Sequence, residues 1–386
     1  MLMKKLFTLS LLRYALVLMS MSVLGDLTSA QAQSNVSYWQ QWSKERELTA
    51  PKRYAYPNSF IGVSLNTYQL RVLLQQAPME FTVAAAQSPL VIYMPLADGS
   101  FARFGIVQST VMDPALAAKY PDIKTYSGQG IDDPAAILKM SLSPIGFHGM
   151  ILSPNGSVFI DPWTSGNNVD CIVYNRDDFK PYQSFTCETD DTHNSKATRQ
   201  YGSIASGATF RSHGTTLRNY RLALSCTGEY AAFYGGTKAG AMAGMVASMN
   251  RVNGVYESEV AVRMTMVPNN DTLIYLNAAT DPFTNTNGST MLGQNITTCN
   301  TIIGSANYDI GHVFSTGGGG VAYLGVPCTA NKAGGVTGSG SPVGDAFDID
   351  YVAHEMGHQF GGSHTFNAST GSCSGNRTAS AAFEPG

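Results

Sequence analysis

The chain contains few charged residues. Lysine, arginine, aspartate and glutamate make up 13% of its 386 residues, whereas about a quarter is usual in soluble domains. The 24 basic and 27 acidic residues leave a net charge of −3, and neither a basic patch nor an array of basic and aromatic residues appears. Because nucleic-acid binding needs a concentrated basic surface, we expect no nucleic acid among the partners of this protein.

Long hydrophobic runs are also absent, except near the N-terminus. There a basic start precedes an apolar stretch over residues 14–24, and small residues around Ala32 resemble a cleavage site. This order is typical of a secretory signal peptide. A membrane anchor over residues 6–25 is the alternative, but Arg13 interrupts it and the remainder is short for a bilayer. We therefore expect a signal peptide over residues 1–32, a secreted, extracellular or cell-surface protein, and no stable membrane insertion after cleavage.

The rest of the chain is long enough for two domains. Residues 33–200 contain short strand-like runs and turn signals with little helical periodicity, which predicts a β-rich domain. From Asp190 to Thr216 the sequence is polar and carries basic residues, and we place a protease-sensitive linker at residues 201–216. In residues 217–386 apolar strands alternate with helical runs, which indicates α/β layers around one sheet.

Five residues near the end of the chain carry the chemistry. They follow the pattern H-E-x-x-H-x-x-G-x-x-H, and are His354, Glu355, His358, Gly361 and His364. Residues four apart share one face of a helix, so His354 and His358 direct two imidazoles to one point. Gly361 permits a turn with positive φ, which brings His364 back as a third ligand. Three nitrogens with one position left for water are what a catalytic zinc ion, Zn2+, requires.

Glu355 is predicted to be the general base of this site. It follows the first ligand, and its carboxylate reaches a water in the open position of the metal. Zinc lowers the pKa of that water and polarises the scissile carbonyl, while Glu355 takes the proton and passes it to the leaving amine. The motif therefore predicts a zinc-dependent endopeptidase.

Other residues near the motif have structural interpretations. Residues 346–353 supply apolar positions for a helical approach to the motif, with Asp345 or Asp348 as the N-cap. His312 lies in an apolar, strand-like run. We predict that it is a hydrogen-bonded core residue and not a metal ligand.

The extended motif resembles that of the metzincins, and its surroundings are similar to the reprolysin (adamalysin) branch, especially to secreted bacterial members. The resemblance covers roughly residues 215–386, and a weaker resemblance to reprolysin-type propeptides covers about residues 88–161. It rests on strand-like and helix-like runs in the order of that family, namely Arg221–Ser225, Thr237–Val252, Val260–Val267, Tyr308–Ser315 and Gly317–Gly325. It implies an α/β (α+β) catalytic domain of the metzincin type, with a mixed sheet and an active-site helix, preceded by a β-rich pro-domain.

The resemblance also implies how substrate is bound and where the sequence departs from the family. The run before Gly325 looks like an exposed edge strand, which would bind protein or peptide substrates as an extended strand. The family places a methionine in a turn below the zinc, and residues 365–386 contain none. We interpret the sequence as a C-terminally truncated fragment of a longer precursor.

The six cysteines are expected to be paired in an exported chain, although fifteen pairings are possible. For two of them, Cys171 and Cys187, two interpretations stay open. A local Cys171–Cys187 disulfide is favoured. Alternatively, a thiolate from one of them occupies the fourth position of zinc and keeps a precursor inactive, as propeptide cysteines do in some metzincins.

The leading hypothesis is a secreted zinc endopeptidase made as a zymogen; the sequence neither predicts nor excludes calcium. The alternative is a catalytically inert surface-binding or adhesive protein on a metallopeptidase scaffold. The missing methionine would favour that alternative if the chain ended naturally at Gly386, whereas the complete set of Glu355 and three histidines argues against it. A hydrolase of non-peptide amides would use the same zinc chemistry, but the edge strand favours peptides.

Overall fold

The computed structural model describes residues 38–43, 46, 57–87, 90–164, 166–179, 186–189 and 216–364. The expected signal peptide, almost all of the expected linker, and the sequence after His364 lie outside these residues. Within the described part, no helix combines the length and the hydrophobicity needed to cross a membrane.

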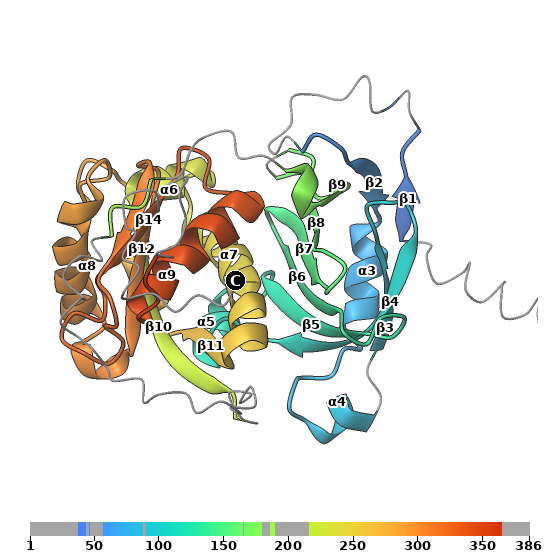
Figure 1. Cartoon of the computed structure of the whole chain (residues 1–386), viewed down its shortest axis with the longest axis horizontal. Coiled ribbons are helices and arrows are strands. Elements are labelled where there is room, and N and C mark those ends of the chain that lie inside the picture. The colour runs from blue at the N-terminus through green and yellow to red at the C-terminus, as the bar shows by residue number, and fades with distance from the viewer. Residues whose placement is uncertain are drawn as a thin grey trace, which may run out of the picture.

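The first half of the chain forms a nine-stranded antiparallel sheet in the order β1-β2-β9-β8-β7-β6-β5-β4-β3 (Figure 1). Its strands are β1 Trp39–Gln41, β2 Ile61–Leu65, β3 Leu90–Pro95, β4 Phe101–Ser109, β5 Lys124–Gly130, β6 Ile137–Ser143, β7 Gly146–Leu152, β8 Val158–Pro162 and β9 Asp170–Asn175. The helices α3 Thr67–Leu74, α4 Val83–Gln87 and α5 Pro114–Lys119 and the 3-10 turn η1 Arg176–Asp178 accompany it. The β-rich character predicted for residues 33–200 is present, while the role of a pro-domain stays a prediction.

Alternation along the strands gives this sheet two buried faces. Leu138 and Met140 of β6 pack in one hydrophobic cluster with Leu70 and Leu74 of α3. Lys139, between them in sequence, points to the opposite face, where it pairs with Glu257 of a helix from the second half. The sheet is therefore covered on one side by its own helix and on the other by the rest of the protein.

The second half contains a five-stranded mixed sheet in the order β11-β10-β12-β14-β13. Its strands are β10 Arg218–Cys226, β11 Val262–Met266, β12 Ile310–Ser315, β13 Gly319–Ala322 and β14 Gly335–Gly338. Only β13, at one edge, runs antiparallel to its neighbour. The helices are α6 Gly228–Phe233, α7 Lys238–Val260, α8 Gly288–Ile302 and α9 His354–Gln359, with the 3-10 turns η3 Asn270–Leu273 and η4 Ser305–Asn307 and the π-helix η5 Ala346–Ala353. The predicted combination of helices with a mixed sheet is confirmed.

Residues of β10 point alternately to the two faces of this sheet. Leu222 and Leu224 pack with α7 and with Met356 of α9 in one cluster, whereas Ala223 packs with residues of α8 in another. The helix expected to end near Val252 continues to Val260, and Figure 1 shows it between the two sheets. The helices α9 and α7 thus cover one face, and α8 covers the other.

The approach to the active-site helix differs from the expectation. Asp345 stands at the N-cap position of η5, but its side chain makes no capping hydrogen bond. It pairs instead with Arg176, with 3.2 Å between Nε and Oδ2. Asp348 lies inside η5 and pairs with Arg251. The predicted capping role was therefore wrong, because both carboxylates are used by arginines from distant parts of the chain.

Asp345→Asn is expected to weaken the pH dependence of folding stability. Burial and, second, the charge of Asp350 raise the pKa of Asp345 from 3.8 to about 7. Between about pH 4 and about pH 7, the folded chain keeps a proton that the unfolded chain has released, so stability falls as the pH rises through this window. Asparagine stays neutral, so the melting temperature should fall less between about pH 5 and about pH 8 in the variant. Equal losses in both proteins would contradict this assignment.

Candidate metal centre

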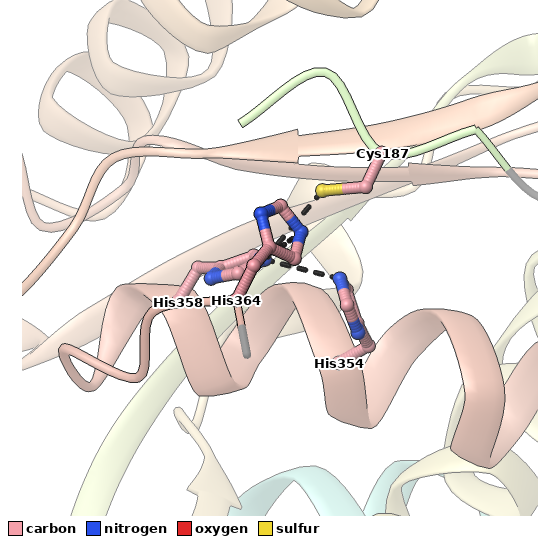
Figure 2. A group of neighbouring side chains, drawn as sticks. All are labelled: Cys187, His354, His358 and His364. Carbon is pink, nitrogen blue, oxygen red and sulfur yellow. Dashed lines mark hydrogen bonds between the residues drawn. The ribbon is translucent and has the colours of Figure 1, made fainter. Parts of the chain in front are cut away.

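The structure brings the three histidines of the motif together. His354 and His358 lie one turn apart on α9, with 3.0 Å between their Nε2 atoms (Figure 2). His364 joins them from the chain that follows, with its Nε2 3.2 Å from that of His358. Three imidazole nitrogens therefore face one point.

The turn that returns His364 depends on Gly361. Its φ is +97°, a conformation that side chains with a Cβ rarely adopt. The N–H of Gly361 donates to the carbonyl of His358 at 2.8 Å, and the N–H of Gly362 donates to that of Gly357 at 2.8 Å. These bonds close the end of α9 in the manner of a glycine C-cap.

The geometry and the donor types fit zinc. The ligand atoms of the three histidines and the sulfur of Cys187 all lie within 4.8 Å of one another. A tetrahedral site with bonds of about 2.0–2.3 Å places its ligands roughly 3.3–3.6 Å apart. The Nδ1 of His358 lies 2.6 Å from the carbonyl oxygen of Gly362, a contact in which the ring donates Nδ1–H and directs the lone pair of Nε2 toward the cluster.

Cys187 is the fourth member of this cluster and comes from a segment that pairs with β13. Residues 186–189 lie parallel to β13, with hydrogen bonds from Gly320 N to the Thr186 oxygen at 3.0 Å and from Glu188 N to the Gly320 oxygen at 2.9 Å. The Cys187 sulfur is 3.5 Å from Nε2 of His358. Burial and, second, the carboxylate of Glu355 raise the pKa of this thiol to about 12, whereas coordination to zinc would lower it.

The favoured Cys171–Cys187 disulfide is wrong. Cys171 is fully buried in β9 of the nine-stranded sheet, whereas Cys187 faces the histidines. The five cysteines within the described residues, Cys171, Cys187, Cys226, Cys299 and Cys328, form no disulfide with one another. The expectation of pairing is therefore wrong among these five, and the sixth, Cys373, lies outside the described residues. The geometry favours the other interpretation, in which Cys187 is a ligand.

Glu355 is fully buried beside the histidines. Its Oε2 accepts a hydrogen bond from the hydroxyl of Thr189 at 3.3 Å, and that hydroxyl accepts from the N–H of Ala322 at 3.0 Å. Gly320 lies directly behind the carboxylate, where a Cβ would come within 2.4 Å of Oε1. The edge strand therefore needs glycine at this position to leave room for the predicted base.

Thr189 was not predicted from the sequence. It contacts Glu355 because side chains two apart on an extended segment share a face, so Cys187 and Thr189 both point toward the metal centre. The only signal in the sequence is a threonine two positions after a cysteine. It predicts a contact with Glu355 only when the pairing of this segment with β13 is known.

His312 is a core residue, as predicted. It is fully buried, and burial lowers its pKa to about 4. Its Nδ1 lies 2.8 Å from Oε1 of Gln359, and its Nε2 lies 2.8 Å from the hydroxyl of Thr337. Gln359 also donates to the carbonyl of Gly311 at 2.8 Å, so this neutral histidine helps to fix α9 against the sheet.

A pocket of about 270 Å³ opens beside β13. It lies between the N-terminus of α8 and residues 317–320, and Glu188 contributes to its wall. The hydroxyl of Ser289 donates to the Glu188 carboxylate at 3.3 Å. Residues 186–189 thus cover the edge strand and border the adjoining pocket.

Comparison with known proteins gives one family. Residues 242–365 match the family described as Metallo-peptidase family M12B Reprolysin-like. No curated protein sequence matches the chain. Among solved structures, the chain is similar to metalloproteinase-II from Bacteroides fragilis, with 10% identity and a TM-score of 0.40 over 76% of this chain and 88% of that chain.

Proposed function

We propose that this chain, whose residues 242–365 are those of a reprolysin-like metallopeptidase, is a secreted zinc endopeptidase made as an inactive precursor. The observation that carries the proposal is the convergence of three imidazole nitrogens and one cysteine sulfur beside an edge strand. The proposed division is a signal peptide at 1–32, a pro-domain at 33–200, an activation linker at 201–216 and a catalytic domain from 217.

His354, His358 and His364 would hold the zinc. When bound, zinc supplies a Lewis acid that makes water a nucleophile near neutral pH and polarises the scissile carbonyl. Glu355 points to the same place and accepts the proton of the attacking water, then donates it to the leaving amine. In the precursor this carboxylate is fully buried, and Thr189 donates a hydrogen bond to it.

Substrate would bind along β13. In the precursor, the backbone of Gly320 already exchanges hydrogen bonds with residues 186–189. An extended peptide can use the same donor and acceptor once this segment has left. Because a segment of the protein's own chain already pairs with β13, we expect protein or peptide substrates to bind there as an extended strand.

The same segment would keep the precursor inactive. The Cys187 sulfur, 3.5 Å from Nε2 of His358 and within 4.8 Å of the ligand atoms of the other two histidines, would supply a fourth ligand to the zinc. Thr189 engages Glu355, so the ligand position and the base are both occupied by one short stretch. Cleavage in the linker at 201–216 would separate this stretch from the catalytic domain in sequence.

Zinc content tests the ligand assignment. Full-length protein should contain one zinc per chain, and His358→Ala should lose it, because two imidazoles retain the ion far more weakly than three. Metal content is measured after dialysis against a weak chelator, with His213→Ala in the expected linker as the matched control. One tightly held zinc in His358→Ala would show that the ligands are wrong.

Peptidase activity tests the function itself. After cleavage in the linker and separation of residues 186–189, the wild-type protein should hydrolyse a generic fluorogenic peptide. Chelator should remove the activity, and added zinc should restore it. A zinc-loaded protein that hydrolyses no peptide would favour the binding role instead.

A further inference from the structure

The nine-stranded sheet is joined to the catalytic half through the edge strand β11, which lies at the opposite edge of the five-stranded sheet from β13. Met112 pairs with Met266 in a parallel bridge. The N–H of Met266 donates to the Val111 oxygen at 2.8 Å, and the N–H of Asp113 donates to the Met266 oxygen at 2.9 Å. Residues 111–113 therefore cover an edge that would otherwise present unpaired backbone groups.

The two halves also share one hydrophobic core. Four residues from the first half belong to the cluster that contains the core of α7 and β11, and each is at most 4% exposed: Val111, Met112, Leu116 and Ile123. Their partners in this cluster include Met249 and Met264. Dissociation would expose this apolar surface to water, which is the dominant cost of separating proteins.

Arg251 forms a buried ionic link across the same interface. Its side chain on α7 is 2% exposed and pairs with Asp161 of β8 at 2.7 Å and with Asp348 of η5 at 3.0 Å. The same guanidinium donates to the carbonyl of Gly149 at 3.1 Å, and Tyr174 donates to Asp161 at 2.7 Å. One charge therefore connects the nine-stranded sheet to the segment that leads into the zinc motif.

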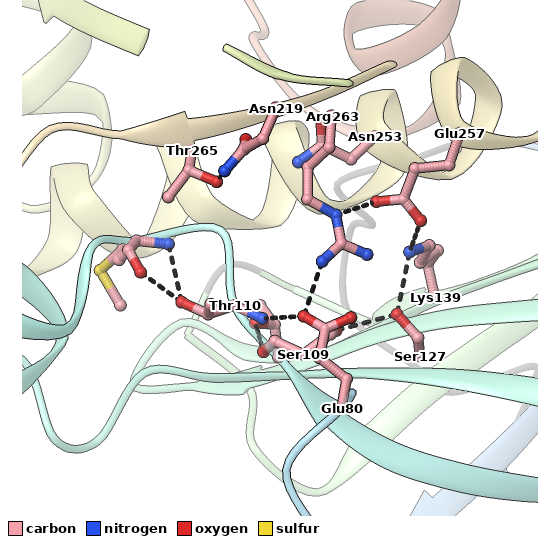
Figure 3. A network of polar contacts seen from close by, with 12 residues as sticks. Glu80, Ser109, Thr110, Ser127, Lys139, Asn219, Asn253, Glu257, Arg263 and Thr265 are labelled. Atoms are coloured by element: carbon pink, nitrogen blue, oxygen red, sulfur yellow. Dashed lines mark hydrogen bonds and ion pairs between the residues drawn. The ribbon is translucent and has the colours of Figure 1, made fainter. Parts of the chain in front are cut away.

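A second polar network lies farther along α7 (Figure 3). Lys139 of β6 donates to Glu257 at 2.6 Å, and Glu257 accepts from Arg263 of β11 at 2.6 Å. Arg263 also forms an ion pair at 2.7 Å with Glu80, which precedes β3 in the sequence. Lys139 is 4% exposed, and the side chains of Arg263 and Glu80 are each 9% exposed. Removing one side of such buried pairs leaves the other charges without compensation.

The blocking segment at residues 186–189 is held quite differently. Thr186 and Glu188 are exposed. Within the described part of the chain, this segment is held by hydrogen bonds to β13, Glu355 and Ser289 and by the contact of Cys187 with the histidines. Inhibition therefore depends on four residues, two of them exposed, while docking depends on a buried core. A cut in the linker breaks none of these contacts, which all join residues within the described ranges.

We infer that the nine-stranded domain remains bound to α7 and β11 as a second chain after the linker is cut, and that departure of residues 186–189, rather than release of the domain, opens the metal centre. When only the linker is cut, Cys187 stays covalently attached to the docked domain, because it follows Phe179 by eight residues in the same fragment. A short tether keeps it at an effective concentration on the order of millimolar, so it returns to the histidines. The second part of this inference rests on the proposed function; the first part does not.

The first experiment measures association alone. A site-specific protease sequence is placed within residues 201–215 of full-length Glu355→Gln protein, which prevents self-cleavage. After the cut, both fragments should co-elute at the size of the uncut protein in high salt and at nanomolar concentration. Separate elution of the nine-stranded fragment would overturn the inference.

Matched variants test the docking surface. Glu80→Gln removes one partner of Arg263 and should speed dissociation of the cut complex roughly tenfold. Asp132→Asn alters an exposed ion pair with Arg103 inside the nine-stranded sheet and should leave the rate unchanged. Thermal unfolding of both uncut proteins checks that they fold. Equal dissociation rates for the two variants would show that the network of Glu80 and Arg263 is not part of the docking surface.

The second experiment measures activity. Full-length protein with Glu355 intact carries a second protease sequence in residues 180–185. Linker cleavage alone should give less than about a tenth of the peptidase activity that both cuts give. Full activity after the linker cut, with the fragments still together, would overturn the role assigned to residues 186–189. Absence of activity in every sample, with the fragments together, would leave the docking intact and refute the proposed peptidase function and the role of this segment with it.

Discussion

Glu355→Gln is expected to leave the zinc content unchanged and to lower peptide hydrolysis by a factor of about 10²–10⁴. The substitution preserves the shape of the side chain but removes the carboxylate that takes the proton. The lost interaction belongs to the chemical step, so kcat should fall far more than KM rises. Steady-state kinetics of the activated, zinc-loaded variant measure both constants.

Glu259→Gln is the matched control for this variant. Glu259 is an exposed glutamate on α7, and its substitution should change neither constant. Near-normal turnover by zinc-loaded Glu355→Gln protein would rule out the proposed mechanism, and another base would have to be found. Comparable losses in both variants would indicate a general effect on folding rather than a specific effect on proton transfer.

The local geometry of the metal centre could be predicted from the sequence because it depends on short spacings. A separation of four residues places His354 and His358 on one face of a helix. Gly361 has the positive φ that the spacing to His364 demands. Neither feature needs information from elsewhere in the chain. The assignment of these histidines as ligands still awaits the zinc measurement.

The environment of the approach helix could not be predicted in the same way. Asp345 and Asp348 have the residue type of an N-cap, but each forms an ion pair with an arginine far away in sequence, Arg176 and Arg251. The capping prediction uses only the residue type and its position near the start of a helix. It therefore cannot take arginines from distant parts of the chain into account. Tertiary contacts decide the role of such carboxylates.

Cys171 and Cys187 show the same limit. Their closeness in sequence favoured a disulfide, yet β9 buries Cys171 in one sheet while residues 186–189 pair with the edge of the other. Strand pairing between distant segments fixes where each sulfur lies, and sequence spacing does not contain that information. The alternation that directs Cys187 and Thr189 to the same side follows only after the pairing is known.

Cys187→Ser is expected to activate the uncut precursor at least roughly tenfold on a short peptide substrate. A thiolate is a strong ligand for zinc, whereas a serine hydroxyl is a weak one. The variant segment keeps its backbone bonds to Gly320, so activation should be partial. Adding Thr189→Val should increase activity further, because Glu355 then loses the hydroxyl that engages it.

Cys171→Ser separates this effect from a general consequence of losing a cysteine. Cys171 is fully buried in β9, and burial raises the pKa of its thiol far above the ordinary value, so this residue stays a neutral core side chain. Its serine variant should remain latent even if its melting temperature falls. Activation by both variants would point to loosening of the nine-stranded domain rather than to release of a zinc ligand. Activation by Cys187→Ser alone would assign latency to the sulfur beside His358, because the two variants share the same chemical change and differ only in where the fold places it.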